Sequence, residues 1–170
     1  MRKLPIKVLL YKNRYRLKED YVEVVLENCK QPNEVVALVD YEDLPKLIKY
    51  KWRLSKQGYA INRQIGYMHR VVLDSPKEKE VDHIHHNTLD NRKSQLRLCT
   101  RSQNSMNRRH QSNSTTKIKG VYKCSQTGKY ACEITVGGRR IWLGRHSSLE
   151  KAKQVRNEAE IKYFGEYQNI

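Results

Sequence analysis

The sequence lacks the features of membrane, secreted and zinc-finger proteins. No apolar run approaches the roughly 18 residues that a transmembrane helix needs. The basic start at residues 1–5 has no long apolar stretch after it, so we expect no secretory signal and a cytoplasmic protein. The 4 cysteines are never spaced as C-x-x-C, which disfavours a zinc ribbon and predicts free, buried or half-buried thiols.

Acidic residues are also scarce relative to basic ones. The chain of 170 residues has 34 Lys and Arg against 18 Asp and Glu, a net charge of +16. The surplus divides into +6 for residues 1–66, +4 for 67–116 and +6 for 117–170. Since 11 Tyr and 2 Trp argue against disorder, this is a folded basic chain, and we expect its partner to be nucleic acid.

Short strand patterns dominate the first third of the chain. Residues 21–27 alternate, residues 34–40 are β-branched and apolar, and residues 51–62 read as a hairpin. Residues 41–50 predict a short helix with Pro45 near its start. We therefore expect a basic arm and a β-rich subdomain within residues 1–66, in a chain of the α+β class.

The centre of the chain combines strand, loop, strand and helix. Asp82 and His83 follow the strand-like run of residues 79–81, a polar loop comes next, and a second short strand covers residues 96–99. Thr100 and Gln103 form a T-x-x-Q capping box that opens a helix carrying Asn104. Adjacent strand side chains point to opposite faces, so Asp82 and His83 can share a site only if the strand ends or bends between them.

Asp82, His83 and Asn104 have the chemistry for hydrolysis of a phosphodiester. Carboxylate and amide oxygens suit a hard divalent cation, and a histidine can deprotonate the attacking water. The alternative is that the histidine-rich loop is only a polar surface, because an Asp-His pair is common by chance.

Residues 67–109 resemble the HNH endonucleases of the ββα-metal class, in particular the homing-type subfamily. The resemblance rests on Met68-His69-Arg70, Val81-Asp82-His83, Asp90-Asn91-Arg92, Leu96-Arg97 and Thr100-x-x-x-Asn104. It implies that Asp82 and Asn104 bind one Mg²⁺ or Mn²⁺ ion per active site, and that His83 is the general base. It also implies an asparagine before the Leu-Arg strand that braces the loop, where this chain has Gln95.

Other residues of this segment have less specific expectations. Asn91 and Gln95 are expected to support the active site. His69 is expected in a strand before the motif, with either a catalytic role beside the phosphate or a structural one. His85 and His86 could contact DNA, but we do not expect them to be metal ligands.

After a polar linker at residues 111–117, the last third predicts three strands and a helix. Gly137-Gly138 marks a two-residue hairpin turn. Ser147 is the expected helix N-cap and Gly165 its C-cap, and an apolar stripe should pack on one sheet face. The other face would then present Trp142 among basic side chains, which is typical of a binding surface.

Residues 118–166 resemble the Apetala-type, ethylene-response-factor DNA-binding domain. The resemblance rests on Gly128-Lys129-Tyr130-Ala131, Glu133-Ile134 and Arg140-Ile141-Trp142-Leu143-Gly144. It implies DNA contacts from the sheet, at Lys119, Tyr122, Lys129, Thr135, Arg140, Trp142 and Arg145. Tyr122 and Thr135 stand where that family has arginines, so its base preference does not transfer.

Together these patterns predict a site-recognising endonuclease that acts on double-stranded DNA as a monomer or homodimer. The expected domains are 1–66, an HNH motif at 67–110, the linker and a DNA-binding domain at 118–170. The alternative is a DNA-binding regulator with an inactive nuclease segment. An RNA-binding protein is a weaker alternative, because the stacking aromatics of an RRM-like sheet are not evident.

Overall fold

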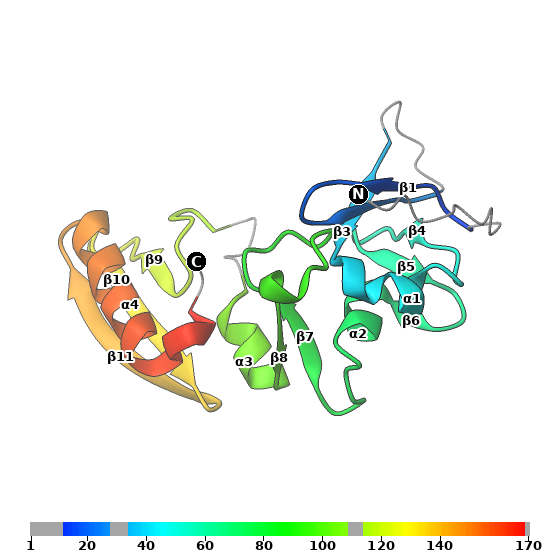
Figure 1. The fold of residues 1–170 in the computed structure, drawn as a ribbon. Coiled ribbons are helices and arrows are strands. Elements are labelled where there is room, and N and C mark those ends of the chain that lie inside the picture. Colours follow the sequence, from blue (N-terminus) through cyan, green and yellow to red (C-terminus); the bar gives the residue numbers. More distant parts are fainter. Residues whose placement is uncertain (1–11, 28–33, 109–113, 169–170) are drawn as a thin grey trace. The chain divides into compact units, whose positions relative to one another are not determined.

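The structure is a computed structural model that describes residues 12–27, 34–108 and 114–168 (Figure 1). Most of the expected basic arm, Cys29 and residues 111–113 of the expected linker lie outside the described residues. Helices and small sheets occur together, as the α+β class requires. The chain divides into two compact units, residues 1–98 and 99–170.

This division differs from the expected domain ranges. The central loop hydrogen-bonds to the N-terminal strands: Asn91 donates its backbone N–H to the carbonyl of Leu38 at 2.8 Å. The central loop and the N-terminal strands therefore belong to the same compact unit. Met106, from the expected nuclease motif, packs against Ile134 and Phe164 of the C-terminal module. The functional ranges 1–66, 67–110 and 118–170 stay a prediction.

The first unit contains the expected N-terminal strands. One sheet has the order β1-β2-β3 and a second has the order β4-β5-β6, and both are antiparallel. Their bounds are β1 Tyr15–Leu17, β2 Val22–Val25, β3 Val36–Val39, β4 Arg53–Leu54, β5 Ala60–Asn62 and β6 Gly66–Tyr67. The predicted strands at 21–27 and 34–40 and the predicted hairpin at 51–62 are confirmed.

Trp52 is fully buried in the core of this unit. Its indole Nε1–H donates to the carbonyl of Leu47 at 3.0 Å. The buried side chain of Asn13 accepts from the Trp52 backbone N–H at 2.7 Å and donates to the Val25 carbonyl at 2.8 Å. These bonds attach the residues before β1 to the core, since buried polar groups need partners.

Short helical segments complete the first unit. They are η1 Tyr41–Asp43, α1 Leu44–Leu47, α2 Met68–Val72 and η2 Lys93–Gln95. The predicted helix within 41–50 is confirmed, with Pro45 in the first turn of α1. The expected strand at His69 is wrong: His69 lies in α2, where the buried residues Met68, His69 and Val72 follow the period of a helical turn.

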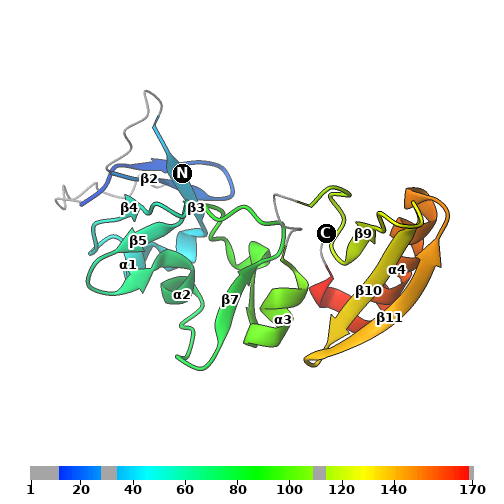
Figure 2. The ribbon, with the colours of Figure 1, turned by 180° about the vertical axis from the view of Figure 1, so that it is seen from behind.

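The second unit is a three-stranded sheet covered on one face by a helix (Figure 2). Its elements are α3 Arg101–Met106, β9 Val121–Lys123, β10 Tyr130–Val136, β11 Arg139–His146, α4 Leu149–Phe164 and η3 Gly165–Tyr167. Val136 pairs with Arg139 across the Gly137-Gly138 turn, whose φ angles of 56° and 78° suit glycine. The predicted hairpin is therefore confirmed.

The long helix α4 packs as its apolar stripe predicts. Ala152 lies with Cys132 in one cluster, and Ala159 lies with Ile134 in another. Gly165 is the C-cap, as expected. The expected N-cap is wrong by one residue: the cap is Ser148, whose hydroxyl accepts from the backbone N–H of Lys151, and not Ser147.

Two expectations about the whole chain can be compared with the described residues. None of their helices is long and apolar enough to span a membrane. Cys99 and Cys132 are buried free thiols and Cys124 is a half-buried one, as predicted.

Candidate active site

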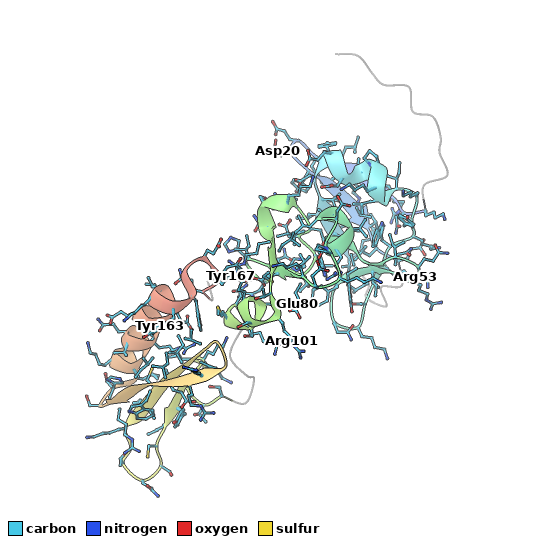
Figure 3. All side chains as sticks on the ribbon, turned by 90° about the horizontal axis from the view of Figure 1, so that it is seen from below. Asp20, Arg53, Glu80, Arg101, Tyr163 and Tyr167 are labelled. Atoms are coloured by element: carbon cyan, nitrogen blue, oxygen red, sulfur yellow. The ribbon has the colours of Figure 1, made fainter. Side chains whose placement is uncertain are left out.

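The centre of the site is the two-stranded sheet of β7 and β8. β7 covers Glu80–His83, β8 covers Leu96–Cys99, and Figure 3 labels the first residue of β7. The backbone N–H of Ile84 donates to the carbonyl of Gln95 at 2.9 Å, which closes the loop between the strands. β7 runs through His83, so the strand does not end between Asp82 and His83. Their side chains have different neighbours, as strand alternation requires, so the expectation that they share one active site stays a prediction.

The carboxylate of Asp82 is buried against an arginine of the neighbouring strand. Arg97 donates to Asp82 Oδ2 from Nε at 2.9 Å and from Nη2 at 2.7 Å. The side chains are only 12% and 7% exposed for Arg97 and Asp82. The charge of Asp82 is therefore compensated within the protein.

The imidazole of His83 lies among aromatic rings. The ring centroids of Tyr59 and His69 are 5.8 and 5.0 Å from that of His83. Burial lowers the pKa of His83, while the nearby side chain of Asn91 and the charge of Asp82 oppose that shift. The net shift favours the neutral imidazole, the form that can accept a proton.

His69 is the second histidine of this ring cluster. Its imidazole stacks on Tyr67 with centroids 5.3 Å apart and an interplanar angle of 9°, and Tyr59 contacts it edge-on. Burial, followed by the proximity of His83 and Arg70, lowers the pKa of His69 to about 3. His69 is thus neutral at ordinary pH, and its predicted role beside the phosphate stays a prediction.

Asn91 is fully buried in the loop that follows β7. Its Nδ2 donates to the Leu89 carbonyl at 3.1 Å, and its side chain interacts with His83. Gln95 is half-buried and its backbone closes the loop. Both residues therefore make contacts that close the loop after β7, and their predicted support of an active site stays a prediction.

The same loop is attached to the N-terminal sheets. Leu38 of β3 donates its backbone N–H to the carbonyl of Leu89 at 2.8 Å. The Thr88 hydroxyl donates to the carbonyl of Gly58 at 2.7 Å. The N-terminal part of the chain therefore forms the scaffold for the loop after His83.

Asn104, the expected second metal ligand, lies on α3 in the second unit. Both hydrogen bonds of the predicted capping box are present between Thr100 and Gln103, which confirms this helix start (Figure 3 labels Arg101, its first residue). At the other end of the helix, Lys119 Nζ donates to the carbonyls of Ser105 at 2.6 Å and Met106 at 3.0 Å. Such bonds satisfy carbonyls that a helix end leaves open.

Six of the seven expected DNA-contact residues belong to or border the β9–β11 sheet. Thr135 pairs with Arg140, and Ala131 lies between Tyr122 and Arg145, so these cross-strand partners share a face. On the same face lies Trp142, which pairs with Glu133 and is 52% exposed. The remaining residues are Lys129, which precedes β10, and Lys119, whose ammonium is engaged at the end of α3.

A divalent cation fits part of this site by chemistry. No three His, Cys, Asp or Glu side chains cluster for a metal ion in residues 12–27, 34–108 and 114–168. Mg²⁺ does not need such a cluster, because it retains waters and is held by one or two carboxylates plus phosphates. Asp82 is such a carboxylate, but Arg97 holds its Oδ2.

The sequence patterns did not single out Tyr59, Tyr67 or Arg97 as members of the site. Each lies in a recognisable pattern of the sequence. Tyr59 lies in the predicted hairpin, Tyr67 lies two residues before His69, and Arg97 alternates with apolar neighbours in a short strand. What the patterns lacked was the long-range contact, since Tyr59 and His83 are far apart in sequence.

Comparison with known proteins gives consistent results. Residues 67–106 match the family model described as HNH endonuclease. The chain is 35% identical over 139 residues to an uncharacterized HNH endonuclease of Acanthamoeba polyphaga mimivirus. This alignment covers 77% of this chain and 72% of the viral protein. The similarity therefore extends beyond the 67–106 segment. No solved structure matches the chain at a significant level.

Proposed function

Because this chain belongs to the HNH endonuclease family, whose members are phosphodiester hydrolases, we propose that it is a metal-dependent endonuclease of duplex DNA with His83 as its general base. The observation that carries this proposal is the setting of His83. Its neutral imidazole is buried on β7, next to Asp82, and is positioned by Tyr59 and Asn91. A general base must hold its accepting nitrogen toward the attacking water, and neighbouring side chains that fix the imidazole provide this orientation.

In the proposed reaction, His83 accepts a proton from water at an imidazole nitrogen. The water oxygen forms a bond to phosphorus as the bond from phosphorus to the leaving oxygen breaks. HNH nucleases generally use a divalent metal ion, which when bound stabilises negative charge on the phosphate and leaving oxygen. Asp82 would hold this ion, with Asn104 as the further ligand that the resemblance implies.

The exposed face of the β9–β11 sheet supports a role in DNA binding. The guanidinium of Arg145 lies 5.9 Å from the centre of the Trp142 ring, and the Arg140 side chain is 73% exposed. An exposed indole flanked by cations is typical of a binding surface, and the cations suit a polyanion. This face is therefore proposed to position duplex DNA, in keeping with the Apetala-type resemblance, and homing-type site recognition is part of the proposal.

The alternative function is a DNA-binding regulator whose nuclease segment does not cut. The observation that favours it is the ion pair of Asp82 with Arg97, which occupies the proposed metal ligand. Gln95, in place of the usual asparagine, points in the same direction.

A plasmid-nicking assay separates the two functions. Supercoiled plasmid is incubated with the protein and either Mg²⁺, Mn²⁺ or a chelator. We expect nicking that requires the metal and that is lost in His83→Ala. The control variant His85→Ala, which changes an exposed histidine of the same loop, should still nick the plasmid. Wild-type protein that binds DNA but never nicks it with either metal, across plasmids with a range of sequences, would establish the regulator.

DNA binding by the sheet is tested separately by fluorescence anisotropy with labelled duplex. Arg140→Ala and Trp142→Ala are expected to weaken binding, while Lys153→Ala, an exposed cation on α4, is the matched control. Equal affinity of all three variants would refute the sheet face as the DNA-binding surface.

A further inference from the structure

Arg97 is a largely buried cation at the proposed active site. Two of its donor nitrogens, Nε and Nη2, point at the same oxygen, Oδ2 of Asp82. The nearby pair of Arg92 with Asp90 is different, because its two donors engage the two carboxylate oxygens separately and the Arg92 side chain is 30% exposed. The Asp82–Arg97 pair therefore concentrates both hydrogen bonds on one oxygen of the proposed metal ligand.

This arrangement conflicts with metal binding at Asp82. A guanidinium stays charged at any ordinary pH, so Arg97 cannot leave the carboxylate by losing its proton. A divalent cation and a guanidinium at one carboxylate repel each other, and burial strengthens the repulsion. If Asp82 is to hold a cation, the guanidinium of Arg97 needs another anion.

The substrate of the proposed function supplies such an anion. Arginine binds phosphate through paired N–H donors, with geometry similar to its binding of carboxylate. A buried charge that loses its partner is strongly destabilising, whereas an exchange of partners keeps both charges compensated. In that exchange the phosphate pairs with Arg97 and the cation pairs with Asp82.

We propose that Arg97 is a phosphate-binding residue of the active site, which Asp82 holds in place until DNA binds. This inference rests on the proposed function, because it takes Asp82 as the metal ligand. Arg97 contacts a backbone phosphate in the complex with DNA, and its departure frees Asp82 for the cation. Linkage then requires that DNA and metal each strengthen the binding of the other by the same factor.

The test is Arg97→Met, measured in two binding experiments without catalysis. Mn²⁺ binding to the DNA-free protein is followed by electron paramagnetic resonance of the unbound ion, and we expect the affinity to rise about tenfold because a competing charge is gone. Binding to a random-sequence duplex is measured in chelator by fluorescence anisotropy. We expect it to weaken about threefold to tenfold, with a salt slope smaller by about 1 for one lost phosphate contact.

The opposite signs of the two effects exclude a merely structural role, and a matched control separates a direct contact from the general loss of one positive charge. Arg92→Met, which removes the neighbouring guanidinium, should leave the Mn²⁺ affinity unchanged. If Arg97→Met does not fold, Arg97→Lys replaces it: one ammonium cannot reproduce the paired donors, so the same two changes are expected with smaller size.

Arg97→Met protein that folds but leaves the Mn²⁺ affinity unchanged, or weakens it, would overturn the role of Arg97. Undiminished DNA affinity and salt slope would overturn it as well. Failure of the proposed function has a different signature, because Asp82→Asn would then leave Mn²⁺ binding intact. Loss of Mn²⁺ binding in Asp82→Asn combined with no change in Arg97→Met refutes only the inference about Arg97.

Discussion

The buried neutral state of His69 predicts that the first unit loses stability in mild acid. The imidazole is 7% exposed and stacks on Tyr67, and its pKa is lowered to about 3. In the unfolded chain the same side chain has its ordinary pKa of about 6.5. Unfolding therefore takes up a proton at any pH between these two values.

The sign of the effect follows from this difference. Above pH 6.5 neither state binds the proton and His69 contributes no pH dependence. Below it only the unfolded state is protonated, so the free energy of unfolding falls by about 1.4 kcal/mol per pH unit until the pH reaches the folded value. Between neutral pH and pH 5, the loss from His69 alone is about 2 kcal/mol, a large share of a typical stability of about 5–15 kcal/mol.

The measurement is urea unfolding at neutral pH and at about pH 5, followed by tryptophan fluorescence. Trp52 is fully buried in the core of the first unit and reports its unfolding. The informative variant is His69→Phe, which retains a ring against Tyr67 and cannot be protonated. We expect it to lose about 2 kcal/mol less than wild type between the two pH values.

Other titratable groups also affect the acid sensitivity of the protein. They are present in both wild type and variant, so the difference between the two proteins reports His69. His85→Phe is the matched control, because His85 is exposed and its substitution should leave the wild-type acid loss in place. Parallel pH dependence of wild type and His69→Phe would refute the buried neutral imidazole.

Three further predictions concern the support of the site and of the sheet. Lys119→Met should raise hydrogen–deuterium exchange in α3, whose terminal carbonyls lose their donor, and Lys119→Arg should raise it less. Gly120→Ala should destabilise the protein by about 2–5 kcal/mol in urea unfolding, since its φ is 72° and its Cβ would lie 2.3 Å from the Glu133 carbonyl oxygen. Gly138→Ala, with positive φ but no atom within 4 Å, should cost only about 1–2 kcal/mol. Asn91→Ala should slow nicking without weakening duplex binding in anisotropy, because it removes the side chain that interacts with His83.

Much of the local structure was predictable because its cause is local, although the N-cap of α4 was predicted one residue too early. The capping box of Thr100 and the glycine turn at 137–138 depend on residues within a few positions of each other, and both are present. The strand at His69 was predicted wrongly. β-branched Val71 and Val72 favour a strand by propensity, but the burial of the Met68 side chain in the core selects a helical turn.

The sequence by itself determined the α+β class, the short strands, the long C-terminal helix and the three residues expected to do the chemistry. Periodicity, turn residues and a family motif are properties of neighbouring positions, so the chain displays them without folding. Only the tertiary structure brought Tyr59 against His83, Arg97 against Asp82 and the Lys119 ammonium to the end of α3. Those contacts depend on how separate elements pack, and burial lowers the pKa of His83 and of the Lys119 ammonium.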